Sequence, residues 1–162
     1  MKLTPLWAVL LLTVHTAWAQ NITVSDAWAR ATVAGQKATG AFMTLQAPQG
    51  ARLVAANSPV ASVTEIHEMK MVDQVMKMSA LPQGLALPAG QKVELKPGGY
   101  HIMLMDLKAP LAANSEVTLS LTFQDAQGQK SVQSVKVPVR AMGQAATPSS
   151  GHPHSPGHSH TH

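Results

Sequence analysis

Two segments of the chain combine histidine with methionine in a pattern that suits a metal ion. His67 begins the segment His-Glu-Met-Lys-Met, and Met78 follows it after a short turn-like stretch. His101 begins the segment His-Ile-Met-Leu-Met, in which Met103 is the first methionine. Alternate side chains of a β-strand share a face, so in a strand His101 and Met103 project on one side, about 7 Å apart.

The ligand types indicate which metal such a site would hold. Thioether sulfur is soft and neutral and favours Cu(I), whereas zinc takes thiolate, imidazole or carboxylate, and calcium and magnesium take oxygen. We therefore predict one Cu(I) ion held by His67, Met78, His101 and Met103. A structural role for these residues is the alternative, because methionine often fills gaps in cores. The methionines for which we expect packing or a surface position are Met43, Met69, Met71, Met76 and Met105.

The C-terminal segment 141–162 carries a second group of histidines. It consists mostly of Ala, Gly, Pro, Ser, Thr and His, which is typical of a disordered tail. Its His-x-His pairs suit Cu(II), and also Ni(II) or Zn(II). We predict that this tail binds Cu(II), with incidental metal affinity as the alternative. The histidines concerned are His152, His154, His158, His160 and His162.

The elements that must position these residues are short β-strands separated by turn residues. Residues 117–123 alternate strictly between apolar and polar side chains, and a turn-like segment at 124–129 predicts a hairpin with the next strand. Strands spaced about ten residues apart predict an all-β sandwich or barrel. The predicted strands are residues 22–24, 27–32, 40–46, 52–58, 64–71, 75–79, 93–95, 100–107, 116–123 and 131–137.

Residues 1–19 have the pattern of a secretory signal peptide. Lys2 precedes an apolar stretch at 6–14, and Ala17-Trp18-Ala19 is a small-x-small cleavage site. An uncleaved N-terminal anchor is the alternative, although the apolar stretch is short for a membrane span. We predict an exported, periplasmic protein with no membrane span after cleavage, a folded domain at 20–140 and the tail at 141–162.

Composition excludes several classes of function. Charged residues make up only 12% of the 162 residues, the net charge is +4, and Lys and Arg form no run, so nucleic-acid binding is not expected. The chain has no cysteine, which excludes disulfides, thiolate zinc sites, iron–sulfur clusters and a thiolate-bound blue-copper site. Neither a Ser-His-acid order nor a phosphate-binding loop is present, and we expect a binding protein rather than an enzyme such as a copper oxidase.

These segments resemble the periplasmic copper chaperones of the PCuAC type, whose pattern is His-x10-Met-x21-His-x-Met. Ten residues separate His67 from Met78, and His101-x-Met103 completes the pattern. The gap between Met78 and His101 is 22 residues, one more than the pattern has. Segments 26–32, 40–43 and 95–107 also look like family segments, and the resemblance covers about 22–139.

The resemblance implies a cupredoxin-like Greek-key β-sandwich or barrel that binds Cu(I) through the four residues named above. It also implies delivery of copper to the dinuclear copper site of cytochrome c oxidase subunit II, or to another oxidase assembly factor. Because the chain has no thiol of its own, a thiol-containing copper protein or an external reductant is expected to supply Cu(I). The alternative is a periplasmic protein of copper homeostasis that buffers copper for tolerance without a dedicated client.

Overall fold

The structure, a computed structural model, describes residues 22–141, which form ten β-strands and no helix. The predicted signal peptide and the five histidines of the predicted disordered tail lie outside the described residues. The strands are β1 (Thr23–Arg30), β2 (Ala38–Gln46), β3 (Ala51–Asn57), β4 (Ala61–Val72), β5 (Val75–Ala80), β6 (Leu85–Leu87), β7 (Lys92–Leu95), β8 (Tyr100–Leu107), β9 (Glu116–Gln124) and β10 (Lys130–Arg140).

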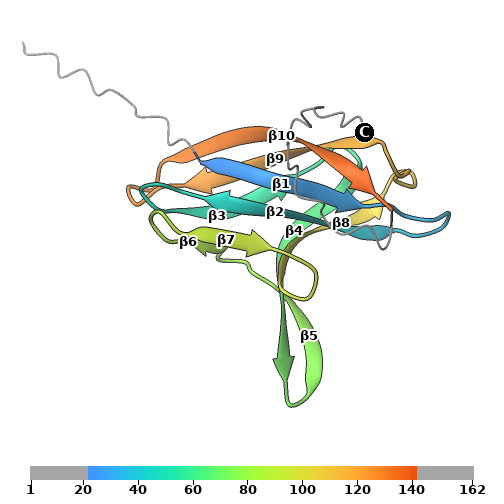
Figure 1. The fold of residues 1–162 in the computed structure, drawn as a ribbon, viewed down its shortest axis with the longest axis horizontal. Helices are drawn as coiled ribbons and strands as arrows, with labels where there is room; N and C mark the ends of the chain where they lie inside the picture. The colour runs from blue at the N-terminus through green and yellow to red at the C-terminus, as the bar shows by residue number, and fades with distance from the viewer. Residues whose placement is uncertain (1–21, 142–162) are drawn as a thin grey trace, which may run out of the picture.

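The strands form one continuous sheet that folds back on itself into two layers (Figure 1). Its order is β5-β4-β8-β7-β2-β1-β10-β9-β3-β6, and β8 also pairs directly with β2. Strands β3 and β4 are far apart in this order but contact each other, which closes the two layers over a common core. Strand β10 joins the layers, because its end pairs in parallel with β1 while its length pairs with β9.

Strict alternation of apolar residues builds the core between the layers. Leu119 and Leu121 of β9 are fully buried, as are Ile102 and Leu104 of β8. The predicted hairpin is confirmed, since β9 and β10 pair antiparallel from Lys130–Gln124 to Pro138–Glu116. The connections β2–β3, β3–β4 and β8–β9 each pass from one layer to the other, as in a Greek-key sandwich. The predicted all-β fold class is therefore confirmed.

The first two predicted strands, 22–24 and 27–32, are one strand with a β-bulge. Asp26 has a φ of 53°, and the register of β1 against β2 shifts between Ser25 and Trp28. The extra residue turns Trp28 away from the core, so that it pairs with Phe42 on the outer face, while Ala29 is fully buried. The prediction of two strands was wrong because a bulge looks like a break in the alternation.

Strand β6 is an element that the sequence pattern did not predict. Its three residues follow Pro82 and Gly84, which are typical of turns and so predict a loop here. In the structure Leu85–Leu87 form a short edge strand that pairs with β3. Gly84 has a φ of 73°, and a Cβ there would lie 2.3 Å from the backbone oxygen of Leu53. Only glycine fits this approach, so the breaker residue is what allows β6 to pair.

Strands β4 and β5 form a hairpin that projects from the body of the sandwich (Figure 1). Asp73 and Gln74 both have positive φ values, of 50° and 63°, and form a two-residue turn of type I′. This turn fixes the antiparallel register, in which Val72 pairs with Val75 and Met71 with Met76. Among the described residues, no helix has the length and apolar character needed to cross a bilayer.

Candidate metal centre

The two histidines of the described domain lie side by side on neighbouring strands. His67 of β4 and His101 of β8 are direct partners in the antiparallel register, so both side chains leave the sheet on the same face. Their ring centroids are 5.6 Å apart, in an edge-to-face arrangement. Ile66 and Ile102, also direct partners, point to the opposite face and into the core. The strands thus separate ligand-bearing residues from core residues by alternation alone.

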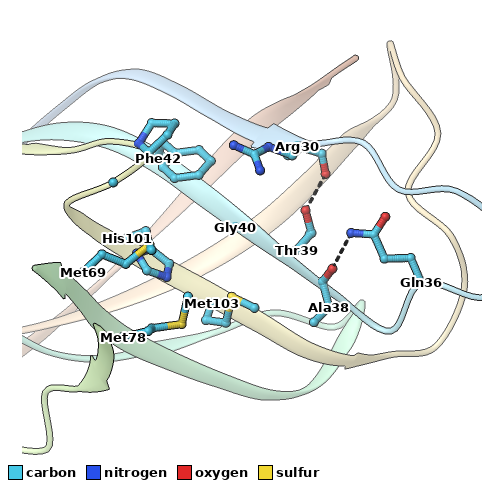
Figure 2. Close-up of a pocket in the computed structure, with 12 residues that line it drawn as sticks. Arg30, Gln36, Ala38, Thr39, Gly40, Phe42, Met69, Met78, His101 and Met103 are labelled. Atoms are coloured by element: carbon cyan, nitrogen blue, oxygen red, sulfur yellow. Dashed lines mark hydrogen bonds between the residues drawn. The ribbon is translucent and has the colours of Figure 1, made fainter. Parts of the chain in front are cut away.

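Three thioethers surround an open cavity of about 240 Å³ next to these histidines. Met103 follows His101 by two residues on the same face of β8, while Met69 and Met78 are cross-strand partners in the β4–β5 hairpin. Figure 2 shows Met69, Met78 and Met103 on the same side of the cavity as the ring of His101. His67 lies beside His101 but is not among the residues that line the cavity.

A hydrogen bond to the backbone fixes the tautomer of His101. Its Nδ1 lies 3.1 Å from the carbonyl oxygen of Gly99, which only accepts, so Nδ1 carries the hydrogen. The lone pair of Nε2 is therefore free in the neutral ring. Burial lowers the pKa of His101 by desolvation, more than the Gly99 bond raises it, and His67 and Arg30 lower it further. The buried imidazole is held in the neutral form that binds metals.

His67 is oriented through its other nitrogen. Its Nε2 lies 2.7 Å from the Oε2 atom of Glu65, and a carboxylate accepts, so Nε2 carries the hydrogen. The Nδ1 atom of His67 is buried and has no hydrogen-bond partner. Buried polar atoms are nearly always paired, so this nitrogen needs a partner, which a cation or a water molecule would supply. Carboxylate–imidazole pairs of this kind are what orients histidine ligands in metal sites.

An aromatic wall closes the other side of the cavity. The Phe42 ring packs against Trp28 at 4.6 Å between centroids and lies 6.3 Å from the ring of His101. The guanidinium of Arg30 lies over Phe42, 5.6 Å from the ring centroid. Gly40 of β2 pairs with Met103 of β8 and also lines the cavity, and its lack of a side chain lets the Phe42 ring lie where a Cβ would otherwise be. This side of the cavity thus presents a packed aromatic pair and a guanidinium, while the hairpin side carries methionines, whose side chains are flexible.

The chemistry of this donor set fits a soft cation. It offers two imidazole rings, each with one nitrogen outside its hydrogen bond, and three uncharged thioethers in or beside one cavity. Within residues 22–141, no three His, Asp or Glu side chains are grouped so that they could hold a metal ion. The cavity therefore offers thioether and imidazole ligands, which suit a soft metal ion, and no cluster of carboxylates, which would suit a hard one.

The structure brings all four predicted ligands to one face of the sheet. His67, His101, Met103 and Met78 come from β4, β8 and β5, as the predicted hairpin and period-2 alternation require. Met69 was not predicted to line the site, because we expected it to pack or lie on the surface. The signal was present in the sequence, because Met69 shares its strand face with His67 and faces Met78 across the turn.

The fold and the site-bearing face define an all-β domain of the PCuAC type. The chain resembles the apo PCuAC domain from PmoF1, with a TM-score of 0.58 and 21% identity, covering 76% of this chain and 98% of that one. It also resembles the solution structure of Cu(I)-DR1885 from Deinococcus radiodurans, with a TM-score of 0.53 and 32% identity, covering 76% and 81%. The predicted resemblance to PCuAC proteins is confirmed.

The family follows from sequence comparison. The chain is 36% identical over 122 residues to "Putative lipoprotein Lxx21020" from Leifsonia xyli subsp. xyli (strain CTCB07), covering 75% of this chain and 71% of that protein. The family model described as "Putative lipoprotein LpqE-like" matches residues 22–139, which is nearly all of the described domain. The chain belongs to this LpqE-like family.

Proposed function

We propose that this protein is a copper carrier that holds one Cu(I) ion through His67, Met78, His101 and Met103. Copper is its cargo, and no bond in a substrate is made or broken. Imidazole and thioether ligands suit Cu(I) and are neutral, so the ion can be passed on without a change of redox state. The Cu(I)-bound structure of DR1885, which shares 32% identity with this chain, supports copper as the cargo.

The observation that carries this proposal is the pair of free imidazole nitrogens. His101 bonds to Gly99 through Nδ1, and His67 bonds to Glu65 through Nε2, so each ring has one nitrogen that takes no part in these hydrogen bonds. The free Nδ1 of His67 is buried without a partner. A purely structural histidine pair would be expected to satisfy both rings, because an unpaired buried polar atom costs about 1–3 kcal/mol.

We propose that the carrier acts in the periplasm. We propose that it delivers copper to the dinuclear copper site of cytochrome c oxidase subunit II or to an oxidase assembly factor. The signal-peptide pattern at 1–19 and the name of the Leifsonia relative as a lipoprotein support export. The histidine tail would capture Cu(II), and a thiol-containing partner would reduce it. Deleting the gene tests the recipient: lost oxidase activity at low copper is expected, whereas sensitivity at high copper alone would indicate copper buffering instead.

Anaerobic titration with Cu(I) against a competing chelator tests the site. We expect one tightly bound Cu(I) in the full chain and in a form ending at Arg140, with extra Cu(II) bound only by the full chain. His101→Ala and Met103→Ala should each weaken Cu(I) binding strongly. Met105→Leu is the matched control, since Met105 shares the strand face of Met103 but does not line the cavity. Unchanged Cu(I) affinity in both alanine variants would refute the site.

A further inference from the structure

The β4–β5 hairpin carries a row of methionines that the four-ligand site does not explain. Met69 pairs with Met78, and Met71 pairs with Met76, so all four thioethers project from one face of the hairpin. We call these four residues the methionine ladder. The Met69–Met78 pair lines the cavity beside His101, so the ladder runs from the metal centre to the hairpin tip.

Packing does not explain the outer pair of this ladder. Met71 is 62% exposed and Met76 is 43% exposed, whereas Met43, a true core methionine of this chain, is 2% exposed. On the opposite face of the same hairpin, Lys70 pairs across the strands with Lys77 and bonds to Glu68 at 2.8 Å, and the pair nearest the turn is Val72 with Val75. Thioethers are therefore concentrated on the one hairpin face that continues into the metal centre.

The geometry points to a second soft-metal site at the hairpin tip, formed by Met71 and Met76, which we propose as the entry and exit point for Cu(I). Directly opposed residues of an antiparallel pair have Cβ atoms about 4.5–5.5 Å apart, and three rotatable bonds per methionine allow both sulfurs to reach one ion. Two neutral thioethers select a soft monovalent cation and release it readily, because they supply neither charge nor a rigid cage.

Transfer from the tip to the centre is an exchange of one thioether for another. Successive residues on one strand face are about 7 Å apart, so Met69 and Met78 are one step from the tip and His67 is one step further along β4. Cu(I) stays Cu(I) throughout, and no proton or electron is transferred between thioethers. This relay role rests on the proposed function of the centre, whereas metal binding by the tip pair does not.

The fixed register of the hairpin gives the tip pair its geometry. The type I′ turn at Asp73 and Gln74 sets which residues face each other, so Met71 and Met76 are held opposite even though both are exposed. A flexible loop with two methionines would lose conformational entropy on closing around an ion. A hairpin whose turn already fixes the register loses less of it.

The test is a titration of the full chain with Ag(I), a redox-inert soft probe, followed by NMR of ¹³C-labelled methionine methyl groups. The first equivalent is expected to shift the methyl signals of Met78 and Met103, and further Ag(I) those of Met71 and Met76. In the double variant Met71→Leu/Met76→Leu the first set of shifts should remain, and Cu(I) uptake from a donor chelate should slow severalfold at unchanged final affinity.

The outcomes separate the two proposals. If the Met71 and Met76 methyls stay unshifted in excess Ag(I), the tip site is refuted, whatever Met78 and Met103 do. If the tip methyls shift while Met78 and Met103 do not, the tip site stands and the proposed centre is wrong. If the double variant takes up Cu(I) as fast as the matched control Met105→Leu, the relay role is refuted. Leucine conserves the volume of methionine at exposed positions, so folding should be unaffected.

Discussion

Gly40 is the residue whose substitution most directly tests how the cavity is built. It faces Met103 across β2 and β8, and it lies two residues from Phe42 on the same strand face. A Cβ at this position would lie 2.8 Å from Cζ and 3.3 Å from Cε2 of the Phe42 ring. Because the ring is packed against Trp28 and covered by Arg30, it has little room to retreat. Gly40→Ala should therefore displace the aromatic wall.

The magnitude follows from two opposing terms. Overpacking of a well-packed site costs about 1–3 kcal/mol. Alanine also restricts the unfolded chain, which stabilises the protein by about 0.4–1 kcal/mol where the backbone conformation is compatible. Taking the middle of each range, the net expectation for Gly40→Ala is a loss of about 1.3 kcal/mol in the free energy of unfolding. Cu(I) affinity should fall as well, since the displaced Phe42 ring lies against His101.

Urea unfolding of the apo-protein and chelator competition for Cu(I) measure the two effects. Gly99→Ala is a matched control for the unfolding measurement alone, because its Cβ would meet only ordinary contacts of 3.6 Å or more, whereas its carbonyl orients His101. The double variant Gly40→Ala/Phe42→Leu removes the Cζ atom, so the cost of the first substitution should largely disappear in that background. The proposed steric contact is wrong if Gly40→Ala lowers the free energy of unfolding as much in the Phe42→Leu background as in the native chain. It is also wrong if Gly40→Ala leaves the free energy of unfolding of the native chain unchanged.

Three further expectations follow from the same geometry. Ile102→Ala should lower the free energy of unfolding by about 2–5 kcal/mol in urea titrations, because this side chain is fully buried in the core, and a smaller loss would contradict its core role. Burial lowers the pKa of His101 below 6.5, so the unfolded apo-protein takes up the proton first and stability should fall as pH falls through about 6.5. His101→Gln should flatten this pH dependence in the same urea assay, and an unchanged slope would exclude His101 as its source. Glu65→Gln should weaken Cu(I) binding about 10- to 100-fold in chelator competition, whereas Glu68→Gln should not, because only Glu65 orients His67.

Local alternation made most of the strands predictable. A strand buried on one face must alternate, and residues 117–123 and 100–107 do so, which also placed His101 and Met103 on one face from the sequence alone. The hairpin that brings Met78 toward His67 followed from the turn-like residues between the two segments. These features depend on residues that are close together in the sequence, which is why they could be predicted.

Features that depend on contacts between residues far apart in the sequence could not be predicted in this way. The bulge at Asp26, which turns Trp28 outward, is set by the register against β2. The bond that fixes the His101 tautomer needs the carbonyl of Gly99 in one orientation, which the presence of a glycine does not by itself specify. The pairing of His67 with His101 joins strands that are more than thirty residues apart, and only the completed sheet brings them together.

In the proposed metal centre the two histidines are buried and the hairpin methionine Met78 is exposed, and this division would let one site both hold and exchange an ion. The imidazoles sit on strands whose other face is core, so Ile66 and Ile102 anchor His67 and His101 from behind. Met78 lies on β5, an edge strand of which every residue is exposed, and it is 47% exposed itself. Its thioether could therefore leave a bound ion without any disturbance of the core. Loss of copper should therefore begin on the hairpin side, while the histidine pair keeps its geometry.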